Sequence, residues 1–364
     1  MRVLMTGGGT GGHVYPALAI ADIIKNKIPD AEIAFVGTDK GIENRLVAKA
    51  GYKMYHVPIQ GIRRSLSPQN IKTAYLVLTS PRKAKKIIEE YKPDIVIGTG
   101  GYVCWPVLHA AASLGIPTAI HESNSVPGLV TRAMARKCTR VLINFEETKQ
   151  YLKRRGGIVR VGNPLRSDFT SKDKVGARKE LGIRNDEIYV VSFGGSGGAE
   201  RINEAILGLS DYYSDSGYNI RHIHAMGERY YAAMTGDKRV ARQINAVPYI
   251  EDMPTHLLAA DIAICRCGAM TLSELALSKT AAILIPSPNV TDDHQYKNAR
   301  HFSDSGAALL LREDELCART LFDNVEPLCK SRKMRESLAK KMASFSDPDA
   351  AKNVVRELHS IAER

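Results

Sequence analysis

Two glycine-rich segments of almost the same sequence, GGTGG at residues 8–12 and GGSGG at residues 194–198, constrain the fold of this chain most. Each follows a short apolar run and precedes a segment with apolar residues at helical spacing. A strand, a glycine loop and a helix in this order form an anion-binding turn, because backbone N–H groups and the helix N-terminus attract negative charge. Two such units half a chain apart predict two Rossmann-like domains facing each other across a cleft.

Short apolar segments alternate with helical segments through the rest of the chain, and its 364 residues are enough for two domains. This alternation is typical of doubly wound parallel sheets, so we predict an α/β protein. Strands are expected at residues 33–36, 52–57, 94–97, 117–120, 141–143, 188–193, 262–264 and 282–285, and a helix at residues 41–49. We expect the domains to span residues 1–163 and 164–345. The last segment, residues 346–364, contains an amphipathic helix that we expect to pack back on the N-terminal domain.

The first glycine loop is compatible with more than one ligand. Gly7, Gly9 and Gly12 satisfy the G-x-G-x-x-G pattern of dinucleotide sites. The acidic residue that holds the ribose in such sites is expected at the end of the second strand, but Asp39 lies beyond that end. His13, at the end of the loop, would crowd a pyrophosphate. An NAD site, a structural turn and a site for a phosphate or a polarised oxygen remain open. The repeated loop disfavours an oxidoreductase, which normally has one nucleotide-binding domain.

Positive charge is concentrated in the N-terminal half. Residues 1–163 carry 24 Lys and Arg against 11 Asp and Glu, whereas the remaining residues carry 27 against 28. A basic half indicates a nucleic acid, an anionic membrane or a phosphorylated substrate as partner. No nucleic-acid-binding motif accompanies the charge, so we expect no nucleic-acid partner.

The basic excess includes a long segment without acidic residues. Residues 44–88 contain ten Lys and Arg and no Asp or Glu, with apolar side chains among the cations. A surface helix of this composition can lie on anionic lipid headgroups, although a buried helix with a solvated basic flank has the same pattern. The expected membrane-contacting residues are Ile62, Arg63, Arg64, Leu66, Arg82, Lys83, Lys85 and Lys86.

Other features of the composition restrict where the protein works. No run of 18 apolar residues is present, so we expect no membrane span, and no leader pattern indicates secretion. The six cysteines are scattered without a C-x-x-C pair. They are expected to be reduced cytosolic thiols rather than disulfides or zinc ligands.

Eight segments, in this order, resemble the MurG family of bacterial cell-wall N-acetylglucosaminyltransferases: GGTGGH, GTGGY, HESN, GNPLR, GGSGGA, YIEDM, RCGAMTLSE and DDHQ-x-KNA. The resemblance extends from residue 3 to about residue 300. It implies the GT-B fold, with an acceptor domain followed by a nucleotide-sugar domain. It also implies that GlcNAc moves from UDP-GlcNAc to the 4-hydroxyl of the MurNAc of lipid I, with inversion, giving lipid II and UDP for peptidoglycan synthesis.

The resemblance further implies a peripheral enzyme on the cytoplasmic side of the cell membrane. Its partners would be UDP-GlcNAc, lipid I (undecaprenyl-pyrophosphoryl-MurNAc-pentapeptide) and the anionic inner leaflet. Other cell-wall synthesis proteins would be further partners. Neither a cofactor nor a metal is implied. A GT-B transferase that uses a UDP-sugar and a different lipid acceptor is the main alternative. A non-catalytic sugar-nucleotide-binding protein is another.

The donor site implied by the resemblance draws on both halves of the chain. Backbone N–H groups around Ser196 and at the helix that begins near Gly268 can bind a diphosphate without a metal. A carboxylate at Glu274 can accept both ribose hydroxyls, and Gln295 suits sugar hydroxyls. The full set is Thr10, Gly11, Gly12, Asn124, Arg166, Ser196, Ile250, Ala269, Met270, Thr271, Leu272, Ser273, Glu274 and Gln295.

An inverting transfer needs a general base for the acceptor hydroxyl. His13 is the first candidate, because an imidazole with an ordinary pKa near 6.5 suits this role at neutral pH, and Glu122 is the second. Two residues depart from the family pattern. Cys267 stands where many members have serine, which would loosen phosphate binding if its side chain touches phosphate. His294 replaces a glutamine of some relatives, and no role is assigned to it.

Overall fold

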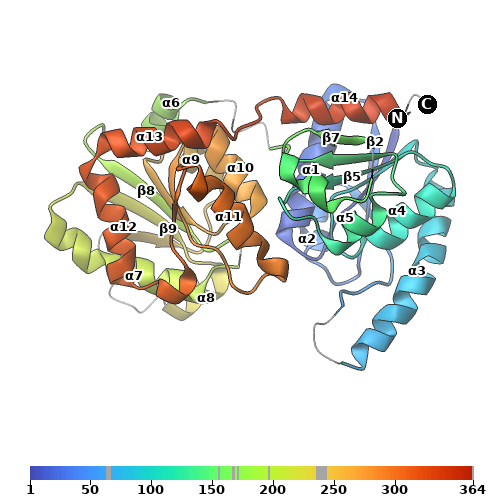
Figure 1. The fold of residues 1–364 in the computed structure, drawn as a ribbon, viewed down its shortest axis with the longest axis horizontal. Helices are drawn as coiled ribbons and strands as arrows, with labels where there is room; N and C mark the ends of the chain where they lie inside the picture. Colours follow the sequence, from blue (N-terminus) through green and yellow to red (C-terminus); the bar gives the residue numbers. More distant parts are fainter. Residues whose placement is uncertain are drawn as a thin grey trace. The chain divides into compact units, whose positions relative to one another are not determined.

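The computed structural model describes residues 1–62, 67–154, 156–165, 169, 172–195, 197–234 and 244–362. The chain divides into two compact units (Figure 1). The first contains residues 1–166 and 347–364, and the second contains residues 167–346. The observed boundaries thus follow residues 166 and 346, against expected boundaries after residues 163 and 345.

The first unit is built on a parallel seven-stranded sheet of order β3-β2-β1-β4-β5-β6-β7. The strands are β1 (Arg2–Thr6), β2 (Glu32–Gly37), β3 (Lys53–His56), β4 (Ile95–Gly98), β5 (Thr118–Glu122), β6 (Arg140–Ile143) and β7 (Ile158–Arg160). The central strands are buried on both faces, which explains their continuous apolar runs. The chain direction across the sheet reverses between β1 and β4, and open α/β sheets bind ligands at the carboxyl ends of strands at such a switch point.

Helices cover both faces of this sheet. They are α1 (Gly11–Lys27), α2 (Glu43–Lys49), α3 (Gln69–Tyr91), α4 (Cys104–Ser113), α5 (Leu129–Met134), the 3₁₀ helix η1 (Glu146–Tyr151) and α14 (Ala350–Ala362). Helix α14, at the red end of the colour scale in Figure 1, packs against α1. Its Val354, Leu358 and Ile361 follow helical spacing and are buried in one core with Val3 and Met5 of β1. The chain therefore returns to its first unit to complete that core.

The second unit has a parallel six-stranded sheet of order β10-β9-β8-β11-β12-β13. Its strands are β8 (Ile188–Phe193), β9 (Ile220–Ala225), β10 (Ile244–Val247), β11 (Ile262–Cys265), β12 (Ala281–Leu284) and β13 (Leu309–Leu310). The second glycine loop follows β8, at the switch point between β8 and β11. Two all-parallel sheets confirm the predicted α/β class with two Rossmann-like units.

The helical segments of the second unit are α6 (Lys174–Glu180), α7 (Glu200–Ser216), α8 (Glu228–Met234), α9 (Met253–Ala259), α10 (Ala269–Ser278), η4 (Thr291–Asp293), α11 (His294–Asp304), η5 (Glu313–Glu315), α12 (Ala318–Lys330) and α13 (Arg332–Ala343). Within the described ranges, no helix is long and apolar enough to cross a membrane. The same ranges hold no group of three or more His, Cys, Asp or Glu residues that could bind a metal ion.

Candidate active site

The first glycine loop is folded tightly against the turn that follows β4. Gly9 has φ of +84°, and a Cβ on Gly7 would lie only 2.2 Å from Thr99 Oγ1. Thr99 Oγ1 donates a hydrogen bond of 2.7 Å to the His13 carbonyl in the first turn of α1. Glycine is required here both for the left-handed backbone and for the close approach of the two turns. Thr10, Gly11 and Gly12 accordingly sit at the junction of loop and helix, at the carboxyl edge of the sheet.

Glu43 of α2 is a buried carboxylate that binds the backbone of this loop, and the sequence did not identify it as a site residue. It accepts hydrogen bonds from Gly9 N at 3.1 Å, Thr38 N at 3.1 Å and Thr38 Oγ1 at 2.7 Å. Burial alone would raise its pKa, but the hydrogen bonds from Thr38 and Gly9 outweigh burial and lower the pKa. Glu43 is therefore ionised at neutral pH and fixes the backbone of the loop.

Replacing this carboxylate is expected to loosen the loop. In Glu43→Gln, an amide N–H₂ would face at least one backbone N–H, so a buried donor would lose its acceptor at a cost of about 2 kcal/mol in unfolding free energy. The melting temperature of the first unit should fall and kcat/KM should drop about tenfold. Glu89→Gln, on the exposed surface of α3, is the matched control and should leave both unchanged. Equal effects of the two changes would contradict this role.

His13 lies in the first turn of α1 with its ring oriented by the loop. Its Nδ1 is 3.1 Å from the Gly8 carbonyl and 3.2 Å from Thr10 Oγ1. A carbonyl oxygen only accepts, so this geometry assigns the hydrogen to Nδ1 and the lone pair to Nε2 of the neutral ring. Gly100, at φ of +107°, makes room for the ring, because a Cβ there would lie 2.6 Å from His13 Cδ2. The tautomer is the one that accepts a proton at Nε2.

Glu122, at the end of β5, is engaged in a different way. Its Oε1 accepts from Asn124 N and Asn124 Nδ2, both at 3.1 Å, and its Oε2 accepts from Gly128 N at 3.0 Å and Thr131 Oγ1 at 2.7 Å. The residue is only 5% exposed. Four donors on one buried carboxylate indicate that Glu122 fixes the loop that carries Asn124. Both oxygens of Glu122 thus already accept hydrogen bonds from the protein.

The second glycine loop, after β8, lies directly against the turn that follows β9. Gly195 and Gly198 have φ of +91° and +73°. A Cβ on Gly198 would lie 1.9 Å from the Met226 carbonyl oxygen. The loop thus repeats the construction of the first one, a glycine turn pressed on its neighbour. Ser196 and Arg166, both expected in the donor site, lie outside the described residues.

Further expected site residues lie at the carboxyl edge of the second sheet. Helix α10 begins after Gly268, which has no side chain to occupy the first N–H groups of the helix. Gln295 Oε1 accepts from Cys267 N at 3.3 Å and Ser287 N at 2.9 Å, so it joins the loops that follow β11 and β12. Glu274 is half-buried on α10. Ala269, Met270, Thr271, Leu272 and Ser273 form the first turns of the same helix.

Two of the expected site residues, and Cys267 beside them in the family motif, turn their side chains inward. Ile250, after β10, is 2% exposed, and Leu272 is completely buried. Only their backbone groups are available to a ligand in this structure. Cys267 is also completely buried, and burial raises the pKa of its thiol. Its side chain therefore cannot contact a phosphate here, and the difference from serine acts through packing.

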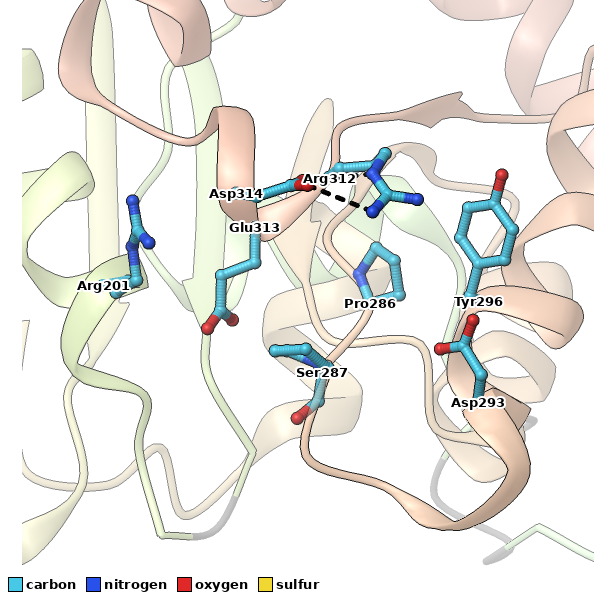
Figure 2. Close-up of a pocket in the computed structure, with 9 residues that line it drawn as sticks. Arg201, Pro286, Ser287, Asp293, Tyr296, Arg312, Glu313 and Asp314 are labelled. Atoms are coloured by element: carbon cyan, nitrogen blue, oxygen red, sulfur yellow. Dashed lines mark hydrogen bonds and ion pairs between the residues drawn. The ribbon is translucent and has the colours of Figure 1, made fainter.

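A separate hollow of about 180 Å³ opens in the second unit (Figure 2). It is lined by Arg201, Pro286, Ser287, Pro288, Asp293, Tyr296, Arg312, Glu313 and Asp314. Three of its charged side chains form ion pairs, since Arg312 Nε lies 3.0 Å from Asp314 Oδ1 and Glu313 pairs with Arg266. Ligand pockets usually measure about 300–1,000 Å³. The hollow contains none of the expected site residues.

Comparison with known proteins gives matches over the whole chain. Residues 3–143 match the glycosyltransferase family 28 N-terminal domain, and residues 189–354 match the glycosyltransferase family 28 C-terminal domain. A protein of Acetivibrio thermocellus is 40% identical over 366 residues, covering 99% of this chain and 98% of that protein. Another, of Alkaliphilus oremlandii, is 39% identical over 377 residues and covers all of both chains.

Both relatives are named UDP-N-acetylglucosamine–N-acetylmuramyl-(pentapeptide) pyrophosphoryl-undecaprenol N-acetylglucosamine transferase. Among solved structures, Acinetobacter baumannii MurG is similar with a TM-score of 0.79 and 29% identity, over 99% of each chain. UDP-GlcNAc 2-epimerase from Neisseria meningitidis has a TM-score of 0.67 at 13% identity, a likeness of fold alone.

Proposed function

Because this chain belongs to glycosyltransferase family 28, and within it to the MurG transferases, we propose that it transfers N-acetylglucosamine from UDP-GlcNAc to lipid I. The acceptor is the 4-hydroxyl of the muramyl sugar, and the products are lipid II and UDP, with inversion at the transferred carbon. The observation that carries the function is about 40% identity along the entire length of transferases named for this reaction. The function places the chain in peptidoglycan synthesis.

The second unit is the proposed site for UDP-GlcNAc. Its glycine loop and the N-terminus of α10 offer backbone N–H groups and a helix dipole to the diphosphate, which supports binding without a metal. Glu274 is proposed to accept the ribose hydroxyls, Gln295 to orient the sugar and the backbone at Ile250 to bind the uracil edge. Arg166 and Ser196 belong to the same proposal through the family motif.

The first unit is the proposed site of the acceptor and of proton transfer. His13 Nε2 takes the proton of the 4-hydroxyl as that oxygen attacks the anomeric carbon, which the Nδ1 contact with the Gly8 carbonyl supports. The binding site for the transferred sugar and the acceptor is proposed to be completed by the loop backbone at Thr10, Gly11 and Gly12 and by the side-chain amide of Asn124. Glu122 acts on Asn124 as a positioning residue.

Helix α3 is the proposed membrane contact, at the cytoplasmic face of the cell membrane. Ile71, Tyr75 and Leu78 are 76%, 65% and 77% exposed and follow one helix face at spacings of four and three residues. The exposed cations Arg82, Lys83, Lys85 and Lys86 continue along the helix, and Ile62, 70% exposed, precedes it. An apolar face flanked by cations is the arrangement that binds anionic lipid. Arg63, Arg64 and Leu66, also expected here, lie outside the described residues.

Charge reversal on α3 is expected to weaken membrane binding. Changing Arg82, Lys83, Lys85 and Lys86 to glutamate should reduce binding to anionic vesicles at least a hundredfold, since each cation contributes about 1 kcal/mol near such a surface. Co-sedimentation with phosphatidylglycerol vesicles measures this, and binding to neutral vesicles should change little. The matched control reverses four exposed cations of α13, namely Arg332, Lys333, Lys340 and Lys341. Unchanged vesicle binding of the α3 variant would exclude this surface.

The function itself is tested by UDP release from UDP-GlcNAc with a soluble lipid I analogue, with UDP-glucose and NADH as controls. Release that depends on the acceptor is the expected result. UDP-GlcNAc binding without release would indicate another acceptor or a binding protein, and NADH binding without UDP-sugar binding would overturn the proposal.

A further inference from the structure

A chain of buried polar side chains crosses the second unit beneath its glycine loop. It consists of Tyr213 and Asn203 of α7, Ser192 of β8, and His222 and His224 of β9, each at most 1% exposed. Ser192 Oγ lies 2.7 Å from both His222 Nε2 and His224 Nδ1. His224 Nε2 lies 3.0 Å from Asn203 Oδ1, and Tyr213 OH lies 3.3 Å from His222 Nδ1. No step assigned so far uses these groups.

When both rings are neutral, the contact of Asn203 with the Met226 carbonyl determines the direction of the hydrogen bonds between these side chains. Asn203 Nδ2 donates to the Met226 carbonyl at 3.0 Å, because a carbonyl can only accept. Asn203 Oδ1 therefore faces His224 Nε2, which must carry the hydrogen. A neutral His224 then has its lone pair at Nδ1, which accepts from the Ser192 hydroxyl at 2.7 Å, the shorter of its two contacts; the Ser192 carbonyl lies 3.3 Å from the same nitrogen.

The Ser192 hydroxyl determines the hydrogen bonds at the Tyr213 end. The Ser192 hydroxyl has given its hydrogen to His224, so it accepts from His222 Nε2. The lone pair of a neutral His222 is then at Nδ1, where the Tyr213 hydroxyl donates. All five groups are satisfied in one direction, from Tyr213 to the Met226 carbonyl, with both imidazoles neutral.

This row of hydrogen-bonded side chains ends at the Met226 carbonyl, in the backbone that contacts the glycine loop. The Met226 carbonyl that accepts from Asn203 is the atom that a Cβ on Gly198 would approach to 1.9 Å. A Cβ on Gly227 would lie 2.7 Å from Gly197 O and from Gly198 N. Asn203 also lies in the first turns of α7, the helix that the loop opens into. A shift of Asn203 or Met226 therefore moves the loop.

We propose that this relay, from Tyr213 through His222, Ser192, His224 and Asn203 to Met226, holds the second glycine loop in its diphosphate-binding form only while both histidines are neutral. The inference rests on the proposed function, in which this loop binds the diphosphate of UDP-GlcNAc. All five side chains are positioning residues, since none of them is proposed to touch the donor.

The surroundings of the two rings favour the neutral forms. Burial lowers the pKa of His224 to about 4 and holds the pKa of His222 well below its ordinary value. Among the residues that the structure describes, the titratable groups acting on these rings are the rings themselves and Tyr213, with Cys329 of α12 beyond it. Protonation of His224 would place a hydrogen on Nδ1, where the Ser192 carbonyl 3.3 Å away would accept it, and the Ser192 hydroxyl would lose its acceptor.

The test compares UDP-GlcNAc binding in four proteins by calorimetry at pH values from 4 to 8. UDP-GlcNAc is the appropriate probe because its diphosphate is a diester and keeps its charge in this range. Wild type should bind with constant affinity above pH 6 and lose affinity as pH approaches 4. Ser192→Ala, which removes the link between the histidines, should weaken binding at pH 7.5 about tenfold. Its thermal stability and circular dichroism establish that it is folded.

Two further variants separate the relay from general packing. Ser210, in α7, is also a fully buried serine but lies outside the relay. Ser210→Ala therefore makes the same chemical change and should bind UDP-GlcNAc as wild type does. His224→Gln keeps an amide donor for Asn203 but cannot be protonated, so it should bind within about threefold of wild type at pH 7.5. Its loss of affinity in acid should shrink or move to lower pH.

Each result decides the question. Equal affinities of Ser192→Ala and Ser210→Ala would overturn the relay, as would an unchanged acid loss in His224→Gln. A Ser192→Ala protein that does not fold leaves the decision to His224→Gln. Wild type that fails to bind UDP-GlcNAc at pH 7.5 would overturn the proposed function, and the inference with it.

Discussion

In His13→Asn, we expect kcat to fall about a thousandfold, the usual size of the contribution of a positioned general base. Asparagine is chosen because its amide nitrogen can take the place of Nδ1 and keep the hydrogen bond to the Gly8 carbonyl. The substitution then removes Nε2 alone, which is the proposed proton acceptor. UDP-GlcNAc affinity should stay unchanged, because His13 is proposed to act on the acceptor hydroxyl and is not among the residues expected to bind the donor. Steady-state kinetics with a soluble acceptor and calorimetry with UDP-GlcNAc measure the two effects separately.

Glu122→Gln is the comparison that distinguishes the two candidate bases. Its carboxylate accepts four hydrogen bonds from the loop that follows β5, so the amide would leave a donor without an acceptor. We expect a rise in acceptor KM and a loss of about 2 kcal/mol in unfolding free energy, with a smaller effect on kcat. External imidazole should restore part of the activity of His13→Ala and none of that of Glu122→Gln. If Glu122→Gln abolishes turnover while His13→Asn preserves it, Glu122 is the base.

The second large effect expected is a loss of stability of the second unit in acid. His224 has its pKa lowered by burial to about 4, whereas an unfolded histidine titrates near 6.5. As pH falls below 6.5, the unfolded state binds a proton that the folded state does not, and the folded state loses stability until its own pKa is reached. One such histidine accounts for about 3 kcal/mol between pH 7 and pH 4, and His222, shifted in the same direction, adds to it.

Hydrogen exchange of peptides from β8 and β9 measures this loss in the second unit. The fluorescence of Trp105, the single tryptophan and a residue of α4, follows the first unit independently. The variant His224→Gln should show a flatter dependence of exchange on pH than wild type. Equal slopes in the two proteins would mean that His224 does not stay neutral in the folded state.

Much of the fold follows from local patterns in the chain. Strand β8 lies at residues 188–193 as predicted, because six consecutive residues are apolar or small and the glycine loop ends the strand. Strand β9 was not predicted, since its sequence IRHIHA alternates apolar and basic residues. Its two histidines are buried only because Ser192, Tyr213 and Asn203 satisfy them, and that pairing depends on which strands and helices are neighbours.

The candidate site also combines residues that the local sequence identifies with residues whose role depends on the tertiary structure. The glycine loops and His13 are visible in the sequence, because their residue types restrict the backbone and the chemistry directly. Glu43 was expected only as part of a helix at residues 41–49. Its role depends on contacts with Gly9 and Thr38, in the loops that follow β1 and β2, and the order of the sheet brings these loops together. Neither Glu43 nor Asn203 carries a sequence signal that distinguishes a buried positioning group from a solvated helix residue.

Helix α14 has a consequence for how the chain is made. The core of the first unit contains β1, near the start of the chain, and Val354, Leu358 and Ile361, near its end. During synthesis, residues 167–346 leave the ribosome before α14 does. The second unit can therefore fold while the apolar face of α1 is not yet covered by α14. The nascent first unit therefore exposes this face until residues 350–362 have been made, and a chain stopped short of residue 350 is expected to be recognised by chaperones and proteases.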